Sequence, residues 1–318
     1  MSKYEEIKSI YENNNMDGLY PSPYDKRDYR FNNAIVLGSV SIPKEYESEN
    51  LYVFDQGNTN MCGACAFSVL RYIQEKPQSN ISEPFSPAFT YANRLPGEEF
   101  EGMYLRSICK KGLEGTVPYH EFPGLYSFAQ CKKEFTARKM ELLEKASNFK
   151  ISKYYKCTSR EQIQTAIITT GGVLVGVYVY DSLMKPNDKG IVEYDPHRDI
   201  KSYGGHCVFL VGWKIIDNKF YWILHNSWGK DYGINGRVYL PEEYPWTEEP
   251  FAIVDDTIEI TIDEYNTKYK TRSILSTLKK SPKLESNIVK NRFCLCNLLF
   301  PILKIKNFFK KFLKKGNE

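Results

Sequence analysis

Two cysteines at the start of a helical pattern are the side chains of this sequence best suited to nucleophilic chemistry. Residues 55–61 form a polar loop, and residues 62–72 contain no proline and are apolar on most turns, which predicts a buried helix beginning near Cys62. A thiol at a helix N-terminus lies close to unpaired backbone N–H groups and to the positive end of the helix dipole, and both favour the thiolate. Gln56, six residues upstream, could donate its side-chain amide to an oxyanion at the same point.

Such a nucleophile needs a general base, and two downstream blocks contain suitable residues. His206 follows two glycines and precedes an apolar, strand-like run, which suits a residue held at the edge of a cleft. Asn226 opens an Asn-Ser-Trp-Gly run and directly follows His225. Neighbouring residues on a strand point to opposite faces, so residues 225 and 226 cannot both face the cleft. We therefore expect His206 to be the base, and we expect His197 to lie exposed in a loop.

In this order, the three blocks resemble those of the papain-like cysteine peptidases. The 144 residues that separate Cys62 from His206 suit that family's interval of roughly 130–150. The resemblance spans about residues 20–262 and is closest to a bacterial and archaeal branch that opens with a Pro-x-x-Asp-x-Arg-Asp-Tyr segment, which residues 23–29 match with one residue fewer between Pro and Asp. It implies an α+β fold in which a helical left lobe faces an antiparallel β-barrel right lobe, with the active site in the cleft between them.

The resemblance also implies a Cys-His-Asn triad. Cys62 would attack a carbonyl as the thiolate, and His206 would hold the proton and later pass it to the leaving amine. Asn226 would accept a hydrogen bond from the imidazole and fix its tautomer. Gln56, with the backbone N–H of Cys62, would form the oxyanion hole. Trp228 would cover the contact between the imidazole and the carboxamide and keep water away from it.

Two registers compete for the nucleophile. Residues 62–65 read Cys-Gly-Ala-Cys and match the family's Cys-Gly-Ser-Cys, which would make Cys65 the nucleophile. That register needs three extra residues after Gln56 and lacks the aromatic residue expected next. The ungapped register keeps the six-residue interval from Gln56 to Cys62, and loop length matters because amide and thiol must converge on one oxygen. We therefore expect Cys62 to be the nucleophile and Cys65, the alternative, to be a small buried hydrophobic residue.

The cysteine pattern gives no sign of a metal or a cofactor. The chain has eight cysteines, and no second Cys-x-x-Cys and no His-x-x-x-His accompanies the pair at 62 and 65. A redox role is disfavoured because the surrounding pattern is not a thioredoxin-like βαβ unit. We expect no metal site and no cofactor.

The N-terminal region bears on the compartment. Residues 1–15 are polar and acidic with no apolar core segment, so no signal peptide is expected. There is also no room before Cys62 for the long inhibitory prosegment of secreted relatives. Both features indicate a reducing, cytoplasmic location in which the cysteines stay free.

The order of predicted elements gives the fold class. Helical patterns come first, at about residues 84–94, 103–111, 130–147 and 160–168, whereas strand patterns follow at 173–180, 208–211, 221–224 and 236–240, with a shorter strand-like run at 51–54. Helices followed by antiparallel strands indicate an α+β fold. We expect a papain-like domain over residues 1–264. Its helical lobe would cover about 51–150 and its β lobe about 151–264, with the lead-in 20–50 packed on the β lobe.

Residues 265–318 differ from the rest of the chain. They hold 14 Lys and Arg against two acidic residues, a formal charge of +12, which leaves about −8 for residues 1–264. The apolar run 293–303 is shorter than the ~20 residues needed to span a bilayer. After Pro301, apolar residues recur near helical spacing with lysines largely elsewhere, so residues 293–315 are expected to lie on an anionic membrane surface. The alternatives are a helix docked on the acidic body and an unstructured tail.

The sequence features bear on four classes of function. The leading hypothesis is a cysteine peptidase that hydrolyses peptide or protein substrates through a thioester acyl-enzyme. The alternative is an acyltransferase that uses the same triad with an amine acceptor and forms an amide. An inactive binding module is disfavoured because every triad position is filled. Nucleic-acid binding is not expected, because the basic residues of the tail are interleaved with Phe and Leu rather than with Gly, Ser or Arg.

Overall fold

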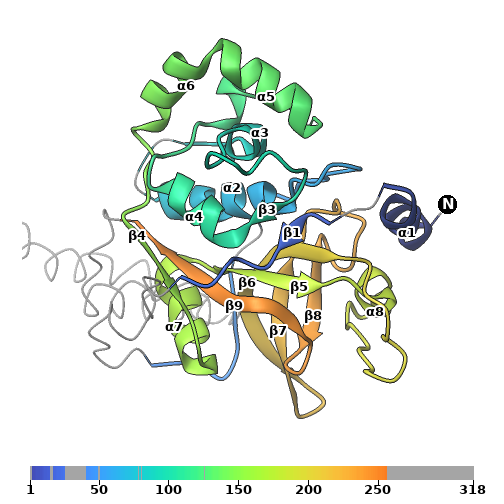
Figure 1. The fold of residues 1–318 in the computed structure, drawn as a ribbon. Helices are drawn as coiled ribbons and strands as arrows, with labels where there is room; N and C mark the ends of the chain where they lie inside the picture. The colour runs from blue at the N-terminus through green and yellow to red at the C-terminus, as the bar shows by residue number, and fades with distance from the viewer. Residues whose placement is uncertain are drawn as a thin grey trace, which may run out of the picture. The chain divides into compact units, whose positions relative to one another are not determined.

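Helix α2 (Cys62–Glu75) lies at the centre of the helical lobe (Figure 1). The computed structural model describes residues 2–14, 17–25, 41–48, 51–77, 79, 81–124 and 126–255. The first ten residues of α2 are all buried, because the helix packs against α3 and α4 on one side and strand β6 on the other. Met61, which precedes the helix, makes no side-chain cap, so the first-turn N–H groups have no capping side chain.

The other helices of this lobe are short, and local sequence signals explain where α3 begins. In α3 (Pro87–Ala92), Ser86 Oγ accepts a hydrogen bond from Phe89 N at 3.0 Å and Pro87 fills the first turn. The lobe also contains α4 (Leu105–Gly112), a 3-10 helix (Tyr119–Glu121), α5 (Phe128–Ala137) and α6 (Lys139–Ala146). Among the described residues, no helix combines the length and the apolar character that crossing a membrane requires.

One helix predicted from the sequence is divided into two helices in the structure. The pattern at 130–147 predicted a single helix, but α5 ends at Ala137 and α6 begins at Lys139. Arg138, between them, has φ −118° and leaves the helical geometry. Its guanidinium donates to the backbone oxygen of Glu121 at 2.9 Å, so a tertiary contact fixes the break that the continuous helical pattern did not show.

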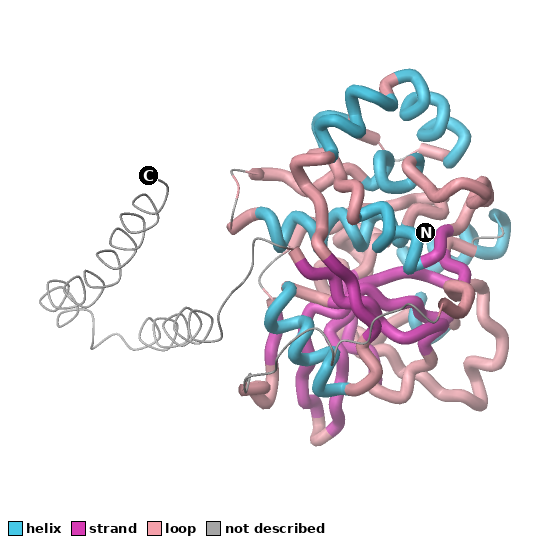
Figure 2. Tube along the Cα trace, turned by 60° about the vertical axis from the view of Figure 1, so that its left-hand side comes forward, coloured by secondary structure: helices cyan, strands magenta, loops and turns pink. Residues whose placement is uncertain are grey.

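The second lobe is an antiparallel sheet in the order β4-β9-β5-β6-β7-β8, with β2 also on β6. Figure 2 shows these strands below most of the helices. The strands are β2 (Tyr46–Glu47), β4 (Lys153–Lys156), β5 (Val173–Tyr178), β6 (Gly205–Ile216), β7 (Lys219–His225), β8 (Arg237–Pro241) and β9 (Trp246–Val254). The α+β class is confirmed. Within the described residues no pairing is recorded between the outer strands β4 and β8.

The sheet is built around β5 and β6, and local turns set its registers. Asp217 and Asn218 have φ of 49° and 61°, the left-handed pair that a tight two-residue hairpin between β6 and β7 requires. Helix α7 (Arg160–Thr170) packs on β9, β6 and β5 and ends at Gly171, whose φ of 88° closes the helix. The strand-like run at 51–54 is not a strand; only Asp55 forms an isolated bridge, with Trp228.

The N-terminal residues add a helix and a strand that the sequence did not predict. Helix α1 (Lys3–Asn14) packs near α8 (Asp181–Met184), and β1 (Leu19–Tyr20) pairs in parallel with β3 (Met103–Tyr104). Figure 1 shows β1 between the helical lobe and the sheet. Of the lead-in, residues 20–25 and 41–48 are described, and in the second stretch the ring of Tyr46 stacks on that of Trp213 of β6 with centroids 5.4 Å apart. The basic tail lies outside the described residues.

A buried arginine joins the two lobes. Arg71 on α2 is fully buried and donates to Glu75 Oε1 at 2.5 Å and to Asp255 Oδ2 at 2.8 Å. Gln74 extends the contact, because its amide donates to the backbone oxygens of Thr170 and Ile253. The last strand of the sheet is therefore tied to the helix that begins with Cys62.

Candidate active site

The Cys62 thiol lies where the two lobes meet. It is the first residue of α2 and has no exposed surface, and the backbone N–H of Cys207 on β6 donates to Sγ at 3.3 Å. Burial raises the pKa of this thiol to about 11, while hydrogen bonds from the backbone of Cys207, Gly63 and Cys62 act in the opposite direction. The backbone N–H groups around the sulfur therefore favour the thiolate, whereas burial of the sulfur favours the neutral thiol.

His206 and Asn226 form a direct pair. His206 is on β6, Asn226 follows the end of β7, and the imidazole Nε2 lies 2.7 Å from the carboxamide Oδ1. The backbone N–H of Ser227 also donates to this Oδ1, at 2.8 Å, which fixes the amide orientation. Nε2 therefore carries the proton, and Nδ1 is the basic nitrogen. Burial lowers the pKa of His206 to about 4, against a smaller opposing effect of the Asn226 hydrogen bond.

Trp228 covers this pair. Its ring lies 4.7 Å from the His206 ring with the planes 23° apart, so the indole stacks on the imidazole. Tyr232 meets the other part of the indole edge-on at 4.8 Å. Trp228 is only 4% exposed, so the contact between imidazole and carboxamide is shielded from water.

The other histidines lie elsewhere. His225 points away from Asn226: its Nε2 lies 3.0 Å from the backbone oxygen of Tyr52, and its ring packs on Phe209. This is the opposite-face arrangement that the strand alternation predicted. His120 is exposed and bonds to Glu83, and His197 is exposed in its loop.

Gln56 is buried beside the Asn-Ser-Trp run. Its backbone N–H donates to Ser227 O at 2.8 Å, and its side-chain Oε1 accepts from Ser227 Oγ at 2.6 Å. The amide Nε2 donates to Thr59 O at 2.7 Å and keeps a second N–H. Thr59 O, which can only accept, and Ser227 Oγ thus together fix the orientation of the amide. Sequence reasoning did not assign Ser227, and the only signal was its place directly after Asn226.

Cys65 lies one helical turn beyond Cys62 and is 1% exposed. It lines a small internal cavity with Val69 and Phe209, and burial raises its pKa well above the ordinary value. Its side chain is part of the hydrophobic core.

The N-terminal segment covers the thiol. A β carbon added at Gly18 would lie 2.7 Å from Cys62 Sγ, so the backbone of residue 18 is directly against the sulfur. The hydroxyl of Tyr11, on α1, is 3.3 Å from His206 Nδ1. Sequence reasoning missed both residues. No local pattern in residues 2–25 indicated that they would lie against the thiol and the imidazole.

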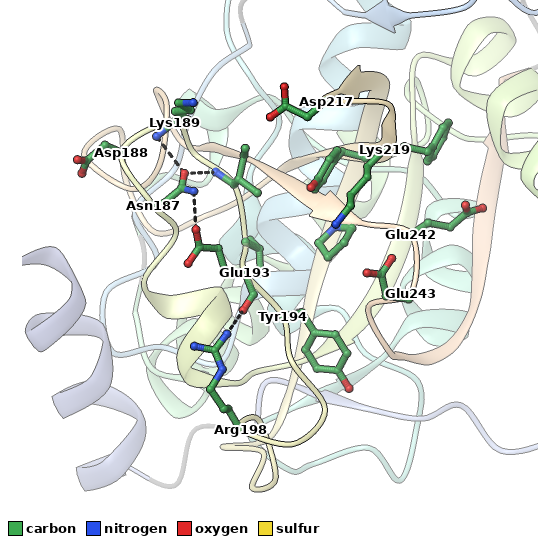
Figure 3. Close-up of a pocket in the computed structure, with 15 residues that line it drawn as sticks. Asn187, Asp188, Lys189, Glu193, Tyr194, Arg198, Asp217, Lys219, Glu242 and Glu243 are labelled. Atoms are coloured by element: carbon green, nitrogen blue, oxygen red, sulfur yellow. Dashed lines mark hydrogen bonds between the residues drawn. The ribbon is translucent and has the colours of Figure 1, made fainter.

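An open groove lies elsewhere, on the sheet lobe (Figure 3). It has a volume of about 880 Å³ and is lined by charged and aromatic side chains, among them Lys189, Tyr194, Lys219, Glu242 and Glu243. It contains neither a thiol nor an imidazole. Among the described residues, no three His, Cys, Asp or Glu side chains are grouped so that they could hold a metal ion.

The structure combines a helical lobe with an antiparallel sheet and places a thiol and a hydrogen-bonded imidazole and carboxamide where the two meet, as the resemblance to papain-like cysteine peptidases implies. Residues 88–245 match the family described as papain family cysteine protease. The resemblance to papain-like cysteine peptidases is thereby confirmed. The matched stretch contains His206, Asn226 and Trp228 but begins after Gln56 and Cys62, so the assignment of the nucleophile rests on geometry.

Individual relatives agree. The chain is 34% identical over 82 residues to a viral cathepsin of Heliothis zea nuclear polyhedrosis virus, a match covering 26% of this chain and 21% of the relative. It is 30% identical over 89 residues to cathepsin Q of Rattus norvegicus, covering 27% and 25%. These matches thus span at most a quarter of the curated relatives' length. The crystal structure of xylellain, a cysteine protease from Xylella fastidiosa, has the same fold: TM-score 0.64 at 20% identity, covering 76% of this chain and 96% of xylellain.

Proposed function

We propose that this protein is a cysteine peptidase that cuts peptide bonds with Cys62 as nucleophile, His206 as acid and base, and Asn226 as the group that orients His206. One observation carries the proposal. The thiol at the uncapped start of α2 contacts the backbone of Cys207, directly beside His206, whose other nitrogen is bonded to Asn226 at 2.7 Å. The family match over residues 88–245 supports the same class of enzyme.

The geometry indicates a role for each atom once a substrate reaches the cleft. Nδ1 of His206 takes the thiol proton, and the Cys62 sulfur attacks the carbonyl carbon. The second N–H of Gln56 and the backbone N–H of Cys62 are the donors that would stabilise the oxyanion. His206 then passes the proton to the leaving nitrogen, the C–N bond breaks, and a thioester remains. Water, deprotonated by His206, hydrolyses the thioester and regenerates the thiol.

The expected acceptor of the acyl group is water. An amine in its place would give an amide, which is the acyltransferase alternative, and the same triad would serve both reactions. Incubation with a peptide library, with and without added amines, separates them by mass spectrometry of the products. Shortened peptides that carry new carboxyl ends support the peptidase. Amide-linked products that form even at low amine concentration would replace it with the acyltransferase.

Cys62→Ala is the control for this experiment, because it removes the sulfur and leaves the fold of the helix unchanged. Products that persist in Cys62→Ala would show that the reaction does not use this site.

A further inference from the structure

Helix α2 begins with a Cys-x-x-Cys sequence that the proposed mechanism uses only in part. Cys62 is the first residue of the helix and Cys65 lies one turn further on, and both thiols are free and buried. Residues three apart in an α-helix lie on one face, with Cα atoms about 5 Å apart. Disulfides join Cα atoms that are roughly 4.4–6.8 Å apart. The backbone of α2 therefore already holds the two cysteines at a separation that a disulfide can bridge.

The start of α2 can adjust so that the two sulfurs meet. Cβ atoms three residues apart in a regular helix are about 5–6 Å apart, against about 3.8 Å in a disulfide, so the first turn has to tighten. Met61 forms no side-chain cap, so no capping hydrogen bond opposes this change. Beside Cys65 lies a small internal cavity, which Ala66 and Val69 also line. The Cys65 side chain can therefore turn more easily than it could in a fully packed core.

Cys207 is the other cysteine in contact with Cys62, but its thiol is less well placed. Its backbone N–H donates to Cys62 Sγ at 3.3 Å, whereas its own sulfur donates weakly to Val208 O at 3.9 Å. Cys207 is also held inside β6, opposite Gly176 of β5. Its backbone cannot move toward α2 without disturbing this pairing. Cys65 is therefore the expected partner of Cys62.

A peroxide converts such a pair into a disulfide in two steps. The Cys62 thiolate attacks the peroxide, the O–O bond breaks, and Cys62 becomes a sulfenic acid while the peroxide leaves as an alcohol or as water. The Cys65 sulfur then attacks the Cys62 sulfur. The S–S bond forms, the S–O bond breaks, and the hydroxide leaves with the Cys65 proton as water. Two electrons pass from the two thiols to the peroxide.

The two steps have different requirements. Burial raises the pKa of Cys62 to about 11, and only the thiolate reacts with peroxide, so the first step requires exposure of this sulfur to solvent. Burial also raises the pKa of Cys65 well above its ordinary value, which slows its attack. Proximity offsets this, because groups held side by side react as if at roughly 10⁵ M or more. The second step is therefore internal to α2 and needs no access from solvent.

We propose that Cys62 and Cys65 form a redox-active pair, in which peroxide oxidises Cys62 and Cys65 captures it as a disulfide that thiols reduce. The disulfide withholds the nucleophile reversibly and prevents its oxidation to the sulfinic acid, which thiols do not reverse. The inference rests on the proposed function only for its biological meaning, because a disulfide at Cys62 would switch the peptidase off. Unlike a dithiol oxidoreductase, such a pair needs no thioredoxin-like βαβ unit.

Peroxide treatment of the full chain tests the pair without any substrate. The chain is exposed to hydrogen peroxide at about 0.1–1 mM, free thiols are blocked with N-ethylmaleimide, and the protein is digested with trypsin without reductant. One tryptic peptide, residues 45–71, contains both cysteines. A disulfide between them leaves this peptide unlabelled and lighter by two hydrogens. This form should account for most of the Cys62 thiol that is lost, and dithiothreitol should restore both thiols.

Cys65→Ala removes the partner and keeps Cys62. In this variant Cys62 should pass on to the sulfinic acid, and the thiol that dithiothreitol recovers should fall about tenfold. Cys207→Ala is the matched control, because it removes the other nearby thiol and keeps the backbone N–H that donates to Cys62 Sγ. It should form the disulfide and recover like the unaltered chain. Labelling of Cys157, which is buried and follows β4, reports unfolding in each sample.

Equal recovery of the thiol in the unaltered chain and in Cys65→Ala would overturn the inference, as would a disulfide that joins Cys62 to Cys207. If Cys65→Ala does not fold, the mass of the peptide from the unaltered chain still decides the question. Failure of the proposed function looks different. In that case the disulfide forms and is reduced as expected, yet the reduced chain cuts no peptide.

Discussion

The hydroxyl of Ser227 donates to Oε1 of Gln56 at 2.6 Å and holds one end of the side-chain amide, whose nitrogen donates to Thr59 O at the other end. Loss of this hydroxyl removes one of the two hydrogen bonds that position the amide. We expect Ser227→Ala to lower kcat about tenfold with little change in KM, and Gln56→Ala to lower kcat about 10²-fold or more.

The kinetics of the paired variants test the positioning role of Ser227. Ser227→Thr keeps the hydroxyl and should restore most of kcat. Ser227→Ala added to Gln56→Ala should cost nothing further, because the group that Ser227 positions is already absent. Independent, additive losses in the double variant would refute the positioning role.

The two cysteines of α2 should behave oppositely. Cys62→Ala should abolish turnover and remove labelling of this position by iodoacetamide. Cys65→Ala should keep activity within about tenfold, because it removes only a packed sulfur from the core. Turnover that is lost in Cys65→Ala and kept in Cys62→Ala would support the gapped register.

Substitutions of His206 and of His225 should have different effects. His206→Ala should lower kcat by roughly 10³-fold or more, and Asn226→Ala by less, as is usual for an orienting residue. His225 is 2% exposed and bonds to Tyr52 O, so His225→Ala should act on folding and cost about 1–3 kcal/mol of stability. Measurements of kcat/KM and of thermal unfolding distinguish the two effects. A catalytic loss in His225→Ala without a fall in Tm would contradict this division.

The closed state, in which the N-terminal segment covers Cys62 and His206, should become less stable in acid. Its His206 has a pKa lowered to about 4, against roughly 6.5 in water. A lowered histidine pKa means that protonation favours the open state. The closed state is thus fully favoured above about pH 6.5 and loses stability as the pH falls toward 4. Tyr11 and Cys62, which also face the site, have raised pKa values and stay neutral throughout this range.

Hydrogen exchange of the α1 amides, corrected for the intrinsic pH dependence, measures this opening. Between pH 7 and pH 5 the open population should rise about tenfold or more. His206→Gln, which cannot titrate, should show a flat profile. An equally steep profile in His206→Gln would assign the effect to another group.

The tail can be tested separately, as a prediction from sequence. Full-length protein should float with anionic vesicles at low salt and less well as salt is raised, because lysines near such a surface each contribute up to ~1 kcal/mol. A chain shortened to end at Asp263 should remain at the bottom of the gradient. Full-length protein that ignores anionic vesicles at low salt would exclude the membrane role of residues 293–315.

Much of the fold and site could be predicted because it depends on local patterns. The apolar runs give the core strands, and Cys62, His206 and Asn226 stand at the ends of such runs, where a helix or strand presents one side chain to a neighbouring lobe. The structure brings His206 and Asn226 together at 2.7 Å because β6 and β7 are adjacent strands.

The missed features depend on distant partners. In α1 the buried residues are Ile7 and Tyr11, four apart on one face, within a helix otherwise polar enough to read as solvated. Nothing local indicates that Tyr11 meets His206, 195 residues away. Ser227 and Gln56 are separated by 171 residues in the same way. Short-range periodicity cannot report such pairs, because it describes which face of an element is buried and not what buries it.

The buried guanidinium of Arg71 has a consequence for how the protein is made. It shares its charge between Glu75, one turn along α2, and Asp255, which is 184 residues further along the chain. A growing polypeptide that has not yet reached residue 255 leaves this cation short of a carboxylate in a dry interior, which is strongly unfavourable. We therefore expect the residues around Cys62 to reach their final packing only after residue 255 has been synthesised.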